Sequence, residues 1–101
     1  MKIIGTGSSL PQKVVTNDDL AAIMDTSDEW ISSRTGIRKR HIATTETTTS
    51  LAVEAVKAAL SDAGTDGSEI DLIIAASVTG AKIVPSLACQ IQAEIGADSA
   101  V

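Results

Sequence analysis

Nine residues in the second half of the chain, IDLIIAASV at positions 70–78, are apolar except at Asp71 and Ser77. This run lacks the alternation of apolar and polar residues that marks a strand with one wet face. It is typical of a strand covered on both faces, as in a parallel sheet with helices on either side. We therefore expect a buried sheet of mostly parallel strands.

The segments on either side of this expected strand have helical periodicity. Between positions 50 and 63 the apolar residues fall on one stripe, and Gly64 can end a helix there. After the strand, Ser86 can cap another amphipathic helix that Gly96 ends. The alternation of strand and helix predicts an α/β fold with right-handed crossovers.

Toward the amino terminus, residues 2–9 form a short segment with β-branched residues at Ile3 and Ile4. This composition predicts a buried first strand. Asn17 precedes an acidic and apolar stretch, so we expect a short helix over 18–24 with Asn17 as its cap. Thr26, followed three positions later by Glu29, has the spacing of a capping box and predicts the start of a second helix.

That second helix should end at Gly36, and residues 37–43 then alternate in the manner of a partly exposed strand. Gly5 and Gly7 follow the β-branched residues Ile3 and Ile4, as glycines follow the first strand in a dinucleotide-binding loop. The third glycine position of that motif holds Leu10, however, so we interpret the pair as a tight exit from the strand.

Length and composition suit a compact domain. The chain has 101 residues, of which 44% are hydrophobic and 21% charged, and we expect residues 1–101 to belong to one domain. A net charge of -5 argues against a nucleic-acid partner. Four basic residues nevertheless lie within seven positions, so a small anionic ligand is a candidate, with a solvated strand edge as the alternative; they are Arg34, Arg38, Lys39 and Arg40.

Cysteine and histidine occur once each, as Cys89 and His41. They can form neither an intramolecular disulfide nor a four-ligand zinc site, so no metal is expected. We expect Cys89 to be a small buried thiol and His41 to be an ordinary strand residue. No run approaches the ~20 apolar residues needed to cross a bilayer, and we expect a soluble, cytoplasmic protein without membrane association.

Thr26, Trp30 and Arg34 are spaced four apart and should share one face of the second helix. An indole can stack on a purine, and a guanidinium can hold a phosphate, so this face could bind a nucleotide. The alternative is structural: Trp30 packs in the core, Thr26 only caps the helix, and Arg34 forms a surface ion pair. Spacing alone leaves both interpretations open.

Several segments together resemble the signature of β-ketoacyl-acyl-carrier-protein synthase III. The most specific are residues 25–31, 34–38 and 40–43. They are joined in the same order by residues 3–8, 10–11, 15–17, 51–55, 71–74, 85–86 and 88–92. The resemblance covers essentially the whole chain. Residues 80–84 depart from it, because many relatives place an aromatic residue there.

The resemblance implies a thiolase-like fold, of which this chain would be an incomplete N-terminal half. It also implies a homodimeric enzyme that condenses an acyl-coenzyme A starter with malonyl-acyl-carrier protein, with loss of carbon dioxide and no further cofactor. In the family, the residues matching Trp30 and Arg34 contact coenzyme A, and the one matching Thr26 lies beside the same nucleotide. The alternatives are another thiolase-superfamily acyltransferase, such as a hydroxymethylglutaryl-coenzyme A synthase or a secondary-metabolite condensing enzyme, and a non-catalytic coenzyme A-binding or assembly module.

The family's catalytic Cys, His and Asn have no counterparts here, and Cys89 matches a non-catalytic position. No catalytic residue is therefore expected in this chain, which should be inactive alone.

Overall fold

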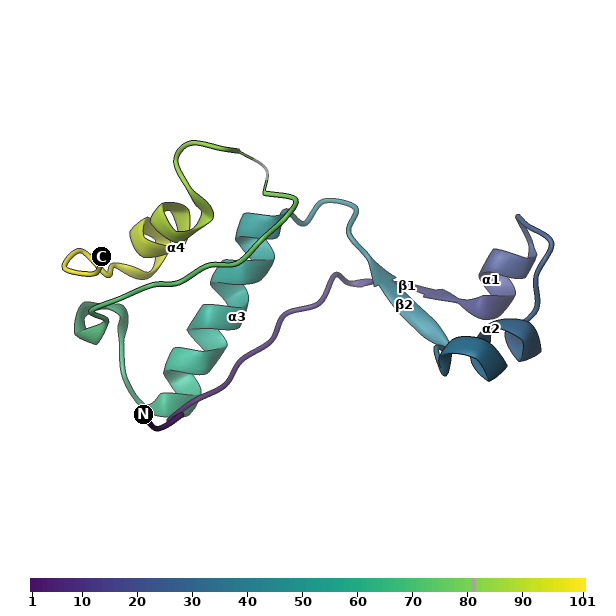
Figure 1. Ribbon diagram of the computed structural model, residues 1–101, viewed down its shortest axis with the longest axis horizontal. Helices are drawn as coiled ribbons and strands as arrows, with labels where there is room; N and C mark the ends of the chain where they lie inside the picture. The colour runs from purple at the N-terminus through teal and green to yellow at the C-terminus, as the bar shows by residue number, and fades with distance from the viewer. Residues whose placement is uncertain (81) are drawn as a thin grey trace. The chain divides into compact units, whose positions relative to one another are not determined.

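The computed structural model describes residues 1–80 and 82–101, so Ala81, within the divergent stretch 80–84, lies outside the described residues. The chain forms two compact units: unit 1 comprises residues 1–9 and 46–101, and unit 2 comprises residues 10–45. Figure 1 shows their elements, which are β1 (Lys13–Thr16), α1 (Asn17–Ala21), α2 (Asp28–Thr35), β2 (Lys39–Ile42), α3 (Thr48–Ala63), the 3-10 helix η1 (Gly67–Glu69) and α4 (Leu87–Ile95).

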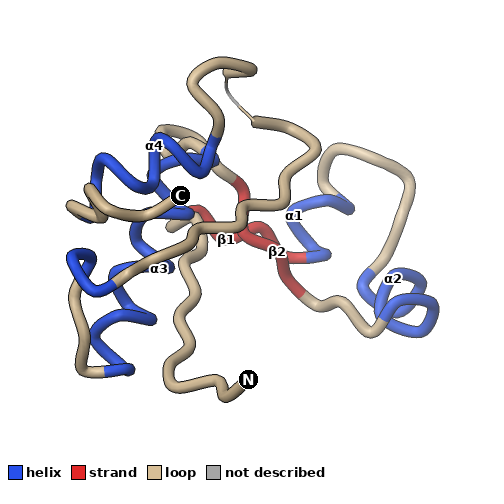
Figure 2. The backbone as a smooth tube through the Cα atoms, turned by 60° about the vertical axis from the view of Figure 1, so that its left-hand side comes forward, coloured by secondary structure: helices blue, strands red, loops and turns tan. Residues whose placement is uncertain are grey.

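Unit 2 is an antiparallel ribbon with two short helices at one end. Lys13 of β1 lies opposite Ile42 of β2, and Thr16 lies opposite Lys39. Helix α1 follows β1 directly and α2 precedes β2, so both helices lie where the ribbon ends (Figure 2). The strand expected over 37–43 is confirmed as β2, whereas β1 was not predicted.

The caps of α1 and α2 differ from the sequence-based expectation by one residue each. Thr16, not Asn17, caps α1: its hydroxyl accepts from the Asp19 N–H at 3.1 Å, and the Asp19 carboxylate accepts from the Thr16 N–H at 2.8 Å. Ser27, not Thr26, caps α2 by accepting from the Trp30 N–H at 3.1 Å. As predicted, Gly36 ends α2, and its backbone has the left-handed conformation.

Unit 1 is built around the packing of α3 against α4. Val53 of α3 and Ile91 of α4 are buried, together with Ala97 and Ala100 beyond α4. The predicted glycine stops and the Ser86 cap are confirmed. Helix α3 begins two residues earlier than expected, because a reciprocal capping box between Thr47 and Ser50 starts it.

The first expected strand, residues 2–9, does not form in the described part of the chain. This segment instead runs beside α3 (Figure 1), where the Thr6 N–H donates to Asp62 at 2.9 Å. A Cβ placed on Gly7 would lie only 2.2 Å from the Ala55 carbonyl oxygen, and one on Gly5 would be similarly crowded. The two glycines therefore serve close packing of this segment on a helix.

The second expected strand, residues 70–78, is likewise not formed as a ladder. Val101 N–H donates to Asp71 at 3.0 Å and Ile73 N–H donates to Val101 at 2.9 Å, which is the pattern of a parallel pair with Leu72 opposite Val101. The α/β class is confirmed, but the expected parallel sheet is reduced to this one pair among the described residues.

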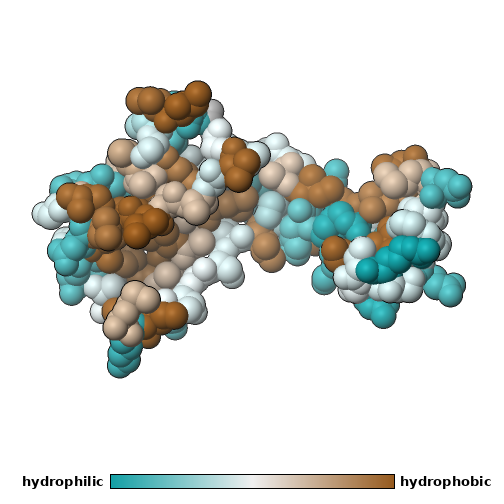
Figure 3. All heavy atoms as spheres, in the orientation of Figure 1, coloured by the Kyte–Doolittle hydropathy of each residue, from teal (hydrophilic) through white to brown (hydrophobic). Residues whose placement is uncertain are grey.

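An apolar hollow in unit 1 lies along the 70–74 stretch. It is lined by residues of the 70–74 stretch and of both long helices, namely Val56, Ala59, Leu60, Ile70, Leu72, Ile73, Ile74, Ile91 and Ile95. Apolar side chains also gather on the face of unit 1 that Figure 3 shows. Burial on both faces was the premise of the strand prediction, and Ile74, which is 85% exposed, does not meet it.

Candidate functional site

The indole of Trp30 and the guanidinium of Arg34 form a stacked pair on α2. Arg34 Cζ lies 4.4 Å from the centroid of the Trp30 ring, within the range of a cation–π contact. Trp30 is 54% exposed, so it does not pack in a core. The predicted common face is therefore confirmed for these two residues, which lie one turn apart.

Thr26 lies beside this pair but is not part of the helix. Because α2 begins at Asp28, the prediction that Thr26 shares its face is wrong. Thr26 and Trp30 instead border a common hollow of about 330 Å³ with Asp25 and Ser27. Trp30 and Arg34 also border a second hollow of about 270 Å³, together with Ser27, Glu29 and Ser33.

The charge of the chain is unevenly divided. Unit 2 holds five of the eight basic residues and five acidic ones, so it is formally neutral, and unit 1 carries the whole net charge of -5. Arg34, Arg38 and Lys39 are exposed. The contact of Arg38 with Asp28 is long, at 3.9 Å, and open to solvent, so it neutralises little of this cluster.

Arg40, the fourth basic residue, does not belong to a solvated edge as expected for a charged strand. It is half-buried and donates to the Val15 carbonyl at 3.2 Å and to Asn17 Oδ1 at 2.6 Å. Asn17 itself is only 1% exposed and donates from Nδ2 to Asp28 Oδ1 and to the Ile37 carbonyl, each at 2.8 Å. Sequence reasoning missed this network because its partners are distant in the chain.

Cys89 and His41 contribute little to this site. Cys89 is exposed in the first turn of α4, which corrects the expectation of a buried thiol; the turn places it beside the capping Ser86 instead of in the core. His41 lies in β2, as predicted, with Nδ1 2.6 Å from the Pro11 carbonyl. Among residues 1–80 and 82–101, no group of three His, Cys, Asp or Glu could hold a metal ion.

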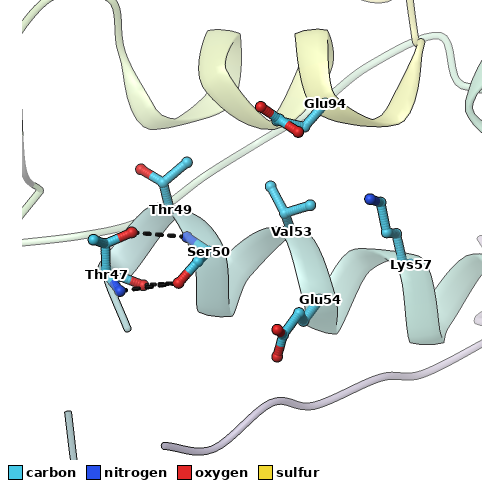
Figure 4. Close-up of a pocket in the computed structure, with 7 residues that line it drawn as sticks. All are labelled: Thr47, Thr49, Ser50, Val53, Glu54, Lys57 and Glu94. Carbon is cyan, nitrogen blue, oxygen red and sulfur yellow. Dashed lines mark hydrogen bonds between the residues drawn. The ribbon is translucent and has the colours of Figure 1, made fainter. Parts of the chain in front are cut away.

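A third hollow, in unit 1, has polar walls (Figure 4), and several of its groups serve the fold. The Thr47 hydroxyl accepts from the Ser50 N–H at 3.0 Å in the cap of α3. Thr49 donates to Gln90 at 2.8 Å, which ties α3 to α4, and Glu54 accepts from Ser9 at 2.7 Å. We therefore attribute this hollow to the packing of unit 1.

No helix in the described residues combines the length and the apolar character needed to span a bilayer.

No family model matches the chain, but individual proteins are similar to it in sequence. A β-ketoacyl-[acyl-carrier-protein] synthase III of Streptococcus pneumoniae (strain Hungary19A-6) is 54% identical over 99 residues, which are 98% of this chain and 31% of that protein. The chain thus spans about a third of the length of the curated relatives it matches.

Solved structures agree with this sequence match. The 3-oxoacyl-[acyl-carrier-protein] synthase III of Aquifex aeolicus VF5 superposes with a TM-score of 0.94 at 52% identity, over 98% of this chain and 32% of that one. The priming β-ketosynthase of the R1128 polyketide biosynthetic pathway also gives 0.94, at 40% identity over 99% of this chain and 30% of that one. In sequence and in its thiolase-like fold, this chain matches the amino-terminal portion of β-ketoacyl-[acyl-carrier-protein] synthase III.

Proposed function

We propose that this chain supplies part of the acyl-coenzyme A surface of a β-ketoacyl-acyl-carrier-protein synthase III. That enzyme joins an acyl-coenzyme A starter to malonyl-acyl-carrier protein, with loss of carbon dioxide, at the start of fatty-acid synthesis. The observation that carries the proposal is the exposed Trp30–Arg34 stack beside two hollows. The 54% identity to a named synthase supports the reaction.

The stacked pair has the chemistry that an adenine nucleotide needs. Arg34 covers one face of the Trp30 indole, and the hollow shared with Thr26 borders the same side chain. A purine on an aromatic ring contributes roughly 1–3 kcal/mol, and the edges of a stacked guanidinium can still donate to phosphate oxygens. Because Ser27 caps α2, the Thr26 hydroxyl is not needed for that cap and is proposed to lie beside the nucleotide.

The bond-forming chemistry is proposed to lie outside these 101 residues. Cys89 is the only cysteine of the chain, and in the resemblance described above it matches a non-catalytic position. The proposal therefore assigns binding, not catalysis, to this chain. It places the parent enzyme in the cytoplasm as a homodimer, with acyl-coenzyme A and malonyl-acyl-carrier protein as its partners.

A second candidate is a priming ketosynthase of a polyketide pathway. It is favoured by the equal TM-score of the R1128 enzyme, although identity falls from 52% to 40%. A full-length synthase carrying this segment would be assayed with malonyl groups loaded on two carrier proteins, one from a fatty-acid pathway and one from a polyketide pathway. Faster condensation with the fatty-acid carrier supports fatty-acid initiation, and faster condensation with the polyketide carrier supports the second candidate.

Calorimetric titration of the chain with coenzyme A tests the binding role. We expect Trp30→Ala to weaken binding by about 5- to 150-fold, through loss of a stacking contact of 1–3 kcal/mol. Arg34→Ala should also weaken binding, through loss of the hydrogen bonds to phosphate. Lys57→Ala is the matched control, because Lys57 is an exposed cation in unit 1. Equal affinity of the native chain and both unit 2 variants would disprove the proposed contacts.

A further inference from the structure

Helix α2 carries the proposed coenzyme A contacts, yet apolar packing does little to hold it. None of its residues is fully buried, and Trp30 is its most exposed large apolar side chain. A helix of eight residues has little stability of its own in water, because its first turn is costly to form. Something other than a hydrophobic face must therefore fix its position.

The buried amide of Asn17 meets this need, because it binds both ends of the helix. Its Nδ2 donates to Asp28, the first residue of α2, and to the carbonyl of Ile37, just beyond the C-cap glycine. Both bonds are 2.8 Å long, and the Asn17 N–H adds a bond to the Arg38 carbonyl at 3.2 Å. One amide thus contacts both the side chain of the first residue of α2 and the backbone just after its last residue.

The chemistry of the partners fixes the orientation of this amide. The Asp28 carboxylate and the Ile37 carbonyl can only accept, and the Arg40 guanidinium can only donate. Nδ2 must therefore face α2, and Oδ1 must face Arg40, which reaches it at 2.6 Å. Because Asn17 is only 1% exposed, the polar atoms of its amide depend on these bonds and not on water.

We propose that Asn17 is a positioning residue for the coenzyme A contacts of Trp30 and Arg34, acting through α2 and oriented by Arg40. This inference rests on the proposed function. Asn17 touches no ligand in this account; it keeps α2 in the one position where Trp30 and Thr26 border the same hollow. Apparent affinity falls in proportion to the fraction of molecules that hold this arrangement.

Three variants separate the two sides of the amide. Asn17→Ala removes all the side-chain bonds, and Asn17→Asp keeps an acceptor for Arg40 but loses both donations to α2. Arg40→Lys leaves the donations of Asn17 to α2 in place. Asp18→Ala is the matched control, because Asp18 is the exposed neighbour in the same turn of α1.

Coenzyme A affinity would be measured by calorimetry and the local opening of α2 by amide hydrogen exchange. Asn17→Ala and Asn17→Asp should each weaken binding by about tenfold, as expected if the competent arrangement falls to a tenth of the population. Exchange should accelerate in α2 but not in α3. Arg40→Lys should have a smaller effect, and Asp18→Ala should match the native chain.

Each other result is informative. If Trp30→Ala weakens binding but both Asn17 variants bind as the native chain does, the positioning role is wrong and the proposed function stands. Faster exchange in α2 and α3 alike would make Asn17 a general stabiliser and would overturn the inference. If Trp30→Ala and Arg34→Ala bind like the native chain, the proposed function fails and this inference with it. Asn17→Asp, of nearly identical shape, still decides the question if Asn17→Ala does not fold.

Discussion

Replacing Gly7 by alanine tests how closely the amino-terminal segment lies against α3. The new Cβ would meet three backbone atoms of that helix, the Ala55 oxygen at 2.2 Å, the Ala59 nitrogen at 2.4 Å and the Ala58 carbonyl carbon at 3.0 Å. None of these atoms can turn away as a flexible side chain could. The segment itself must therefore shift, and the bond from the Thr6 N–H to Asp62 should be strained or lost.

The expected loss of stability is the sum of two destabilising contributions and one stabilising contribution. Overpacking of this kind costs about 1–3 kcal/mol. Loss of the Thr6 bond adds about 1 kcal/mol, whereas alanine offsets about 0.4–1 kcal/mol by restricting the unfolded chain. We therefore expect the free energy of unfolding to fall by about 1–4 kcal/mol.

Urea unfolding followed by far-UV circular dichroism measures this loss. Gly80→Ala is the matched control, because among the described residues its Cβ would meet only the Lys82 oxygen, at an ordinary 3.5 Å. It should therefore show only the gain of about 0.4–1 kcal/mol that comes from restricting the unfolded chain. If Gly7→Ala were as stable as the native chain, the segment would not be pressed against α3, and the packing role of the glycine would be refuted.

Three further predictions concern unit 2. Ser27→Ala should destabilise the chain by about 1 kcal/mol through loss of the α2 cap, and Thr26→Ala should not. Equal effects of the two variants in thermal unfolding would show that Ser27 is not the cap of α2. The bonds from the Thr16 N–H and hydroxyl lower the pKa of Asp19 below its ordinary value of 3.8, so this contribution to stability is present above pH 3.8 and lost as the pH falls below it. Thr16→Val should raise the pKa of Asp19 toward 3.8 in an NMR titration, and an unchanged pKa would contradict the hydroxyl's part in that shift. Gly36→Ala should cost about 1 kcal/mol in chemical denaturation, because φ is 72° there, and a neutral result would show that α2 ends differently.

Structural features that depend on only a few neighbouring residues were predicted well. The glycine stops of α2, α3 and α4 depend only on the local need for a left-handed residue, and the structure has φ near 70° at all three. The Trp30–Arg34 contact was predictable for the same reason, since residues four apart on a helix are neighbours whatever surrounds them.

Features that depend on distant partners were not predictable in this way. Residues 2–9 and 70–78 have strand-like composition, but a strand forms only where another segment pairs with its backbone. Asn17 is a good cap by type, yet its amide is used by Asp28, Ile37 and Arg40, and the cap passes to the preceding threonine. No local pattern reveals those three partners.

The guanidinium lying over Trp30 has a consequence for how a planar ligand would arrive and leave. Because Arg34 covers one face of the indole, a planar ligand can stack only on the opposite face of the ring. A base stacked on that face would contact the tryptophan on one side only, so it could dissociate without movement of the indole. For the proposed coenzyme A contact, release of the ligand would therefore need no rearrangement of the indole.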